Sequence, residues 1–344
     1  MKKFLSEIFL IQIVATYLVI CGHSYPLESQ IPNWLNNARA FLYTFHMPLF
    51  VWISGYLLIY TSQSLKTTVQ GFLFKRFRKL IIPYIILSAF ALVPKFIVQP
   101  YISDSFNFDI ISIVRIFAVP RENVWGHFWF LPMIFIMGCI GFGADRLFCR
   151  FELRKIGWMA LTSALFCVYV MTFKQDICGW FAINDLLAFG WFYSLGALCG
   201  CYKCLSRAYP RIGIFNSIMS FAVALIIYPP PSLCAQSIML QAVIRAFVAL
   251  LMIYSLSSLC VVVSRKLEIN KDAVYAQTFT IFLLSWPCQA MVNIIIERLL
   301  GCPYCVIMPL QFVAGICGPI ALILLVNQIE NKFNIHWISF SLGK

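Results

Sequence analysis

The chain has 344 residues, of which 61% are hydrophobic and 11% charged, and its formal net charge is +13 at pH 7. Soluble proteins carry about a quarter charged residues, so this composition excludes a soluble globular domain. The positive charge does not indicate nucleic-acid binding, because the basic residues gather in alternate loops between apolar runs.

Ten apolar runs have the length that a bilayer crossing requires. They cover residues 4–24, 39–61, 80–98, 125–144, 156–173, 183–201, 213–228, 240–264, 274–297 and 306–328. The sequence therefore predicts an all-α polytopic membrane protein, with about ten transmembrane helices in one bundle and a single domain over residues 1–344. The first run lacks a small-residue cleavage site, so we expect a retained span.

The distribution of positive charge predicts how the bundle is oriented. Most basic residues fall near the chain start and in every second loop: Lys2, Lys3, Lys66, Lys75, Arg76, Arg78, Lys79, Arg146, Arg150, Arg154, Lys155, Lys203, Arg207, Arg211, Arg265, Lys266, Lys271, Lys332 and Lys344. Cytoplasmic loops of membrane proteins are enriched in Lys and Arg. We therefore expect both termini in the cytoplasm and His23, at the end of the first run, near the outer face.

Histidines occur in or beside the first two runs. An imidazole is costly to place in a membrane, so His23 and His46 are candidates for a functional site. Gln12 precedes His23 by eleven residues, which puts both side chains on one helix face, about 16 Å apart along the axis. The structural alternatives are an interfacial His23, an interhelical hydrogen bond from Gln12, and a packed His46 beside Pro48.

The 14 cysteines lie mainly in apolar runs, where Cys behaves as a small hydrophobe. Two C-x-x-C pairs occur, Cys201/Cys204 and Cys302/Cys305, but the chain has only four His. We therefore expect no metal site. A local disulfide between Cys302 and Cys305 is left open, because we expect these residues on the oxidising side.

Five segments, in order along the chain, resemble those of the acyltransferase-3 family of membrane O-acyltransferases. They are IQIVATYLVICGHS at 11–24, FHMPLFVWISGY at 45–56, KRFRKLIIPY at 75–84, HFWFLP at 127–132 and TFTIFLLSWP at 278–287. The last is similar to the version in the fucose-4-O-acetylase-like branch. Each segment is weakly specific alone, and their common order makes the resemblance fairly specific.

The resemblance implies transfer of an acyl group, most simply acetyl, from cytoplasmic acyl-CoA (acetyl-CoA) to a sugar hydroxyl. The acceptor would be a surface polysaccharide or its lipid-linked precursor, and the location the bacterial inner membrane. His23 would take the hydroxyl proton, since imidazole exchanges protons near neutral pH, or would form a transient acyl-imidazole. His46 would orient or hydrogen-bond a reacting group, or act only in packing.

The resemblance also implies a basic residue where this chain has Gln12. An amide carries no charge to hold a phosphate or a carboxylate. The chain is then a divergent enzyme, one without activity, or one that takes a cation from elsewhere, for which Arg245 is the candidate.

The remaining candidates concern the two ligands. Lys75, Arg76, Arg78 and Lys79 suit the phosphates of coenzyme A, or alternatively only orient the chain and contact lipid headgroups. Other candidates for substrate binding lie within or at the ends of later runs, namely His127, Trp129, Arg245 and Ser285.

Each of these has a structural alternative. Trp129 offers a sugar-stacking face or belongs to the interfacial belt of aromatic side chains. An intramembrane Arg245 indicates a cavity lining or a buried pair. Ser285 precedes Pro287, whose missing N–H leaves a backbone carbonyl that the hydroxyl can satisfy.

Two other functions compete with acyl transfer. An exporter of polysaccharide or lipid-linked glycan would need no covalent chemistry, and the uncharged Gln12 favours it. Against it, the sequence lacks the paired interrupted spans that mark transporter halves. A purely structural membrane subunit is the third interpretation.

Overall fold

The computed structural model describes residues 6–26, 31–98, 109–207, 214–228, 237–266 and 277–333. Within these ranges the chain folds into helices, with no β-strand. Nine helical segments there are long and apolar enough to cross a membrane, and a shorter apolar helix, α11 (Ile214–Ile227), matches the seventh predicted run. The prediction of an all-α polytopic membrane protein is confirmed.

The long helices broadly follow the predicted apolar runs. They are α1 (Ser6–His23), α2 (Asn33–Tyr60), α5 (Ile82–Val98), α7 (Phe130–Arg150), α8 (Arg154–Thr172), α9 (Ile183–Tyr202), α12 (Ile238–Val263), α13 (Thr278–Val292) and α14 (Tyr304–Phe333). Helices α2, α7 and α14 extend beyond their apolar runs through segments that contain polar residues, whereas α13 is shorter than its predicted run.

Short helices complete the chain. The α-helical ones are α3 (Gln63–Lys66), α4 (Val69–Arg76), α6 (Ile110–Ala118) and α10 (Cys204–Arg207). Tighter 3₁₀ turns form η3 (Pro120–Glu122), η4 (Gly126–Trp129) and η5 (Trp180–Ala182), and wider π-helical segments form η1 (Phe77–Ile81) and η9 (Asn293–Leu299). The segment η1 joins α4 and α5 into one continuous helical span, Val69–Ile97. The third span therefore begins before residue 80, where the apolar pattern predicts its start.

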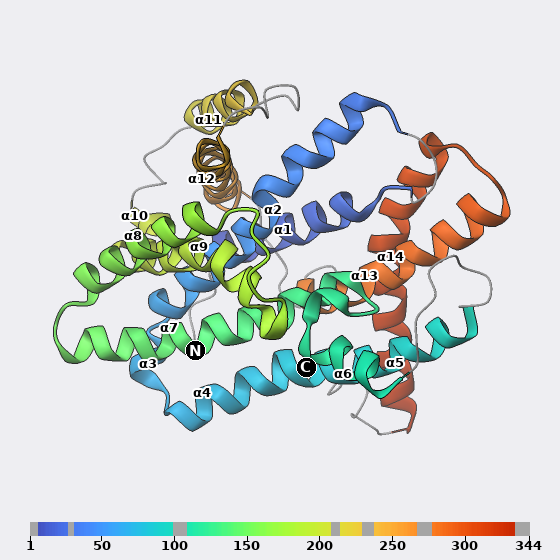
Figure 1. The fold of residues 1–344 in the computed structure, drawn as a ribbon, viewed down its shortest axis with the longest axis horizontal. Helices are drawn as coiled ribbons and strands as arrows, with labels where there is room; N and C mark the ends of the chain where they lie inside the picture. Colours follow the sequence, from blue (N-terminus) through green and yellow to red (C-terminus); the bar gives the residue numbers. More distant parts are fainter. Residues whose placement is uncertain are drawn as a thin grey trace.

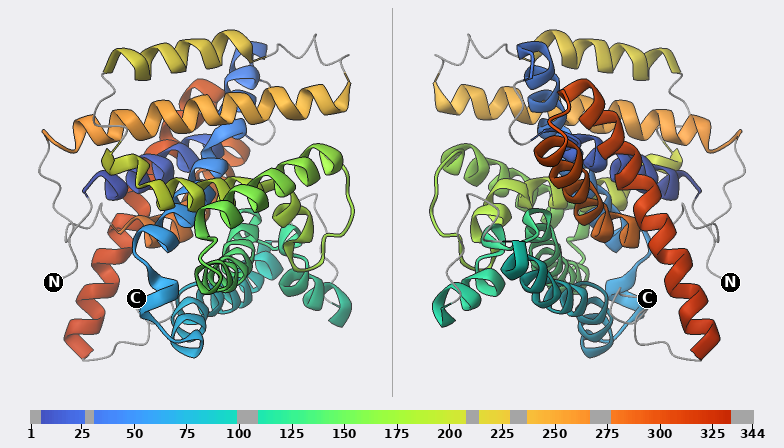
Figure 2. Two further views of the ribbon diagram at one scale, coloured as in Figure 1. Left: turned by 90° about the vertical axis from the view of Figure 1, so that its left-hand side faces the viewer. Right: turned by 90° about the vertical axis from the view of Figure 1, so that its right-hand side faces the viewer.

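Helices α1 and α2 cross the middle of the bundle (Figure 1). Helix α9 packs along α2, with α8 beside it, while α13 and α14 pack against α1 from the other side. Helices α11 and α12 lie side by side across one end (Figure 2). The helix that carries Gln12 and His23 is therefore enclosed by other helices.

Glycines allow the backbones of α2 and α9 to touch. A Cβ atom on Gly55 would overlap the carbonyl oxygen of Tyr193, and one on Gly196 would overlap that of Trp52. Gly196 and Gly200 form the G-x-x-x-G spacing that brings membrane helices close together. The segment around Gly55 therefore acts in helix packing.

A buried carboxylate ties together α3, α7 and α8. Asp145 accepts hydrogen bonds from the Arg154 guanidinium, at 2.8 Å to each oxygen, and from Trp158 Nε1 at 3.0 Å. The hydroxyl of Ser64 donates a further bond to it. A buried charge is tolerated only when paired and hydrogen-bonded in this way, so we assign this cluster to stability.

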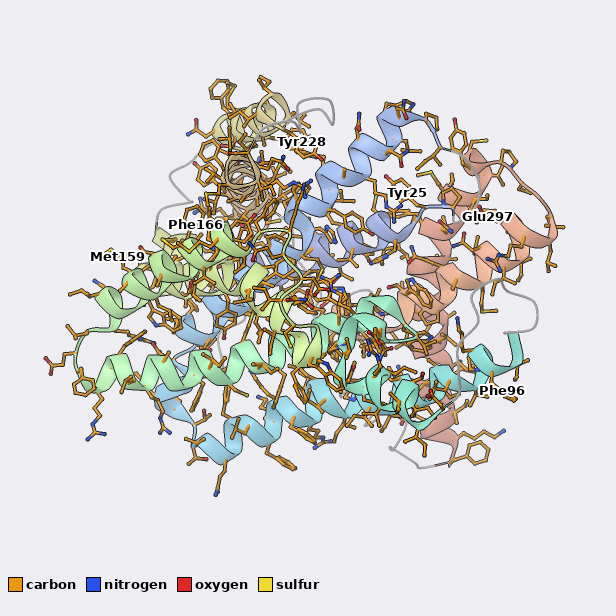
Figure 3. All side chains as sticks on the ribbon, in the orientation of Figure 1. Tyr25, Phe96, Met159, Phe166, Tyr228 and Glu297 are labelled. Carbon is orange, nitrogen blue, oxygen red and sulfur yellow. The ribbon has the colours of Figure 1, made fainter. Side chains whose placement is uncertain are left out.

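Large apolar side chains cover the outside of the bundle. Phe96 and Met159 are 65% and 53% exposed, and Figure 3 shows both at its periphery. Lipid tails solvate such side chains at no cost, whereas water would not.

Candidate active site

A cavity of about 680 Å³ lies between α1, α2, α4, η1, α7 and α13. We call it the Gln12 pocket, and its polar lining consists of Gln12, Thr16, Ser54, Gln63, Lys75, Arg76, Lys79, Gln277, Thr278 and Thr280. Three cations and no carboxylate line it within the part of the chain that the structure describes. Such a lining suits a ligand with several negative charges, such as phosphate groups.

Aromatic rings and one glycine position the cations of the Gln12 pocket. The guanidinium of Arg76 lies 5.0 Å from the Phe72 ring centroid and donates to the Ile134 carbonyl at 3.3 Å. It occupies space that a Cβ atom on Gly138 would fill. The Lys79 ammonium lies 5.4 Å from another ring, that of Phe279. These contacts hold the charges in place, as cation–π contacts do elsewhere.

The structure separates the four cations that the sequence grouped together. Lys75, Arg76 and Lys79 line the Gln12 pocket, whereas Arg78 is absent from its lining. Because Gln12 faces the same cavity, three cations stand near the position where the family resemblance implies one.

Three phenylalanines close one wall of the Gln12 pocket. Phe50, Phe130 and Phe282 come from α2, α7 and α13, and all three line it. Their ring centroids lie 5.7 to 6.1 Å apart. The Phe282 ring also lies 5.3 Å from the ring of His127. Phe282 therefore separates the cavity from the histidines, and we call these three side chains the phenylalanine layer.

Three histidines and a tyrosine form a cluster beyond the phenylalanine layer. The ring of His23, at the end of α1, lies 6.4 Å from that of His127 and 6.2 Å from that of Tyr43. Tyr43 in turn lies 4.8 Å from His46, and its hydroxyl donates to the Gly22 carbonyl at 3.0 Å. Residues far apart in sequence thus meet around His23.

Hydrogen bonding distinguishes the three imidazoles. His46 Nδ1 lies 2.8 Å from the Leu42 carbonyl, which can only accept, so Nδ1 carries the proton and Nε2 the lone pair. Neither ring nitrogen of His127 has a partner with hydrogen-bond geometry among the described residues, although the backbone of Leu283 and Phe282 lies close. His46 and His127 are buried and His23 is half-buried. His23 is thus the most accessible of the three.

A second cavity, of about 350 Å³, lies between α2, η3, α8, α9 and α12. We call it the Arg245 pocket, and its lining comprises Tyr43, Thr44, Pro48, Arg121, Tyr169, Thr172, Phe173, Lys174, Gln175, Asn184, Asp185, Leu187, Ala188, Phe189, Phe192 and Arg245. Arg245 therefore lines a cavity, but not the one that contains Gln12. Tyr43 belongs both to this pocket and to the histidine cluster.

Trp129 packs against two side chains that line the Arg245 pocket. The Arg121 guanidinium lies 3.8 Å from its ring centroid, and the Phe189 ring stacks on it with centroids 5.5 Å apart. Trp129 is buried, and its two neighbours line the cavity. A sugar in the cavity would therefore touch Arg121 and Phe189 rather than the Trp129 ring.

Ser285 acts within its own helix. Its hydroxyl donates to the Phe282 carbonyl at 3.1 Å, in the turn before Pro287. The carbonyl that Pro287 leaves without its amide is that of Leu283, four residues earlier, so the Ser285 hydroxyl bonds a different acceptor and supports the Phe282 segment. The cysteines Cys302 and Cys305 are free thiols, and the described residues contain no cluster able to hold a metal ion.

Tyr43 was not identified from the sequence. Arg39, Tyr43 and His46 follow one another at spacings of four and three, which is the signature of one helix face. The Arg39 guanidinium lies 5.4 Å from the Tyr43 ring. Reading this face of α2 together with His46 would have pointed to the tyrosine.

Residues 6–328 match the acyltransferase-3 family model, which is described as an acyltransferase domain. No curated protein matches the chain significantly, and no solved structure does so.

Proposed function

The chain belongs to the acyltransferase-3 family, and we propose that it transfers an acetyl group from acetyl-CoA to a sugar hydroxyl. The acceptor is a surface polysaccharide or its lipid-linked precursor, and the enzyme acts in the inner membrane of a bacterium. Family membership supports membrane acyl transfer in general, and the two pockets support the choice of donor and acceptor.

The observation that carries the proposal is a continuous series of contacts between the two pockets. From the Gln12 pocket it passes through Phe282, His127 and His23 to Tyr43, which lines the Arg245 pocket. Packed side chains separate the two cavities. This arrangement favours transfer of a small acyl group from one cavity to the other over transport of a glycan polymer through the protein. This distinguishes the proposal from a glycan exporter.

The donor occupies the Gln12 pocket in this scheme. Lys75, Arg76 and Lys79 hold the phosphates of coenzyme A. The positive loops of the sequence favour a cytoplasmic position for this pocket, where acyl-CoA is available. The thioester end points toward the phenylalanine layer, which must move to admit the acyl group to the histidines.

The acceptor occupies the Arg245 pocket, and His23 acts as general base. It takes the proton from the sugar hydroxyl while the hydroxyl oxygen attacks the thioester carbonyl carbon. The carbon–sulfur bond then breaks, the electron pair leaves on sulfur, and His23 returns the proton to the coenzyme A thiolate. Tyr43 holds the end of α1 through its bond to Gly22 and so positions His23.

Two measurements test this function. Mass spectrometry of surface glycan from cells with and without the protein should show acetyl groups only when it is present. Purified protein in lipid nanodiscs should release free thiol from acetyl-CoA only when an acceptor glycan is added. Movement of glycan across vesicles without thiol release would support the exporter and contradict the proposal.

A further inference from the structure

The Arg245 pocket carries more positive charge than its own carboxylates neutralise. Within the described part of the chain three cations line it, Arg121, Lys174 and Arg245, and only one lining residue, Asp185, is acidic. Asp185 is paired with Arg121, whose Nε donates to Oδ1 at 3.0 Å. One acid thus offsets one cation.

The other two cations meet neutral groups. The Lys174 ammonium donates to Oε1 of Gln241 at 2.8 Å, and the Arg245 guanidinium lies 5.7 Å from the ring of Phe173. An amide oxygen and a ring face stabilise a cation less than a carboxylate does. An anionic ligand would therefore stabilise Lys174 and Arg245 more than Arg121, which already has a carboxylate partner.

The carboxylate in the pocket also has unused bonding capacity. Asp185 is 3% exposed, and its buried Oδ2 has no hydrogen-bond partner among the described residues. A buried carboxylate oxygen without a donor costs free energy, which a ligand hydroxyl would recover. The pocket combines two cations that face neutral groups with one carboxylate oxygen able to accept a hydrogen bond from a hydroxyl, and its 350 Å³ lies within the range of small-ligand sites.

We propose that the acceptor of this enzyme is an anionic sugar, whose negative group binds Lys174 and Arg245 while one of its hydroxyls donates to Asp185. This inference rests on the proposed function, because it takes the Arg245 pocket as the acceptor site. The anion is a carboxylate on the sugar ring or a phosphate that links the sugar to a lipid.

Binding of matched probes to purified protein in nanodiscs tests the inference without requiring acyl transfer. The probes are methyl glucoside, methyl glucuronide and farnesyl-diphosphate-linked glucose, which differ in where, and whether, they carry negative charge. We expect at least one anionic probe to bind about tenfold more tightly than the neutral one, and salt to weaken that preference.

Variants locate the preference in the pocket. Arg245→Gln and Lys174→Gln should each remove most of it, whereas Arg245→Lys, which keeps the charge, should retain much of it. The control is Arg115→Gln, because Arg115 is an exposed cation that pairs with Glu122 outside the pocket. Melting temperatures of all variants show whether any loss reflects unfolding.

The outcomes distinguish a sugar carboxylate from a lipid-linked phosphate as the source of negative charge. They also distinguish failure of this inference from failure of the proposed function. Preference for the glucuronide identifies a sugar carboxylate, and preference for the diphosphate probe identifies a lipid-linked phosphate. Equal binding of all probes, or a preference that survives Arg245→Gln and Lys174→Gln, overturns the inference. A charge preference without thiol release from acetyl-CoA supports the anion site and contradicts the proposed function instead.

Discussion

Gly138 makes space for Arg76 in the proposed donor site, and adding a single methyl group at Gly138 should test this. A Cβ atom at Gly138 would overlap the Arg76 guanidinium. Because this group ends a flexible side chain, Gly138→Ala moves it at little cost to folding. Its displacement from the Gln12 pocket should remove the contact with Phe72 and, if the proposed donor binds there, one charged hydrogen bond to its phosphates.

The magnitude follows from those two contacts. A cation–π contact contributes about 0.5–1 kcal/mol at an exposed site and about 2 kcal/mol when it is desolvated, and a hydrogen bond to a charged group about 1.5–3 kcal/mol. The donor bond alone corresponds to a rise of roughly ten- to a hundredfold in the Kd for acetyl-CoA. Isothermal titration of acetyl-CoA into the purified protein measures this, and thermal unfolding should show little change.

The same helix supplies the control, since a Cβ atom at Gly143 would meet nothing within 4 Å. Gly143→Ala should leave the Kd unchanged. Arg76→Gln should weaken binding about as much as Gly138→Ala, and combining them should add nothing, because both remove one interaction. Additive losses, or an equal loss in Gly143→Ala, would refute the assignment.

The remaining predictions concern the phenylalanine layer and the buried carboxylate. Phe282→Ala opens the wall of the Gln12 pocket, so the transfer rate with butyryl-CoA relative to acetyl-CoA should rise about tenfold. The lipid-facing control Phe90→Ala should not change this ratio, and an unchanged ratio in Phe282→Ala would contradict the role of the layer. Asp145→Ala leaves Arg154 without its carboxylate and should cost about 3–5 kcal/mol, seen as a lower melting temperature. The exposed Glu152→Gln is its control, and equal melting of both variants would contradict the stabilising role.

The sequence predicted the helices well because membrane spans are local features. Each apolar run is long enough to identify alone, and a spacing of eleven residues places Gln12 and His23 on one helix. The apolar pattern predicts the ends of the helices less accurately. For example, α2 begins at Asn33, six residues before its predicted apolar run. Helix formation continues through polar residues that hydropathy does not count.

The site itself depends on contacts between helices, which local patterns do not determine. The sequence could not show that His127 lies beside His23, nor that Gly138 makes space for Arg76. It suggested Arg245 as the cation missing at Gln12, but the fold puts these two residues in different cavities. Lys75, Arg76 and Lys79 supply the charge instead, because η1 and α4 bring them to the Gln12 pocket.

The most direct test of the account is the rate of acetyl transfer by purified His23→Ala protein. We expect the rate to fall by about 10²–10⁴-fold, the usual contribution of a general base, while acetyl-CoA still binds and the protein remains inserted. Cys21→Ala, an exposed residue on the same helix, is the matched control and should keep full activity. Undiminished transfer by His23→Ala would contradict the central claim that His23 takes the acceptor proton between the two pockets.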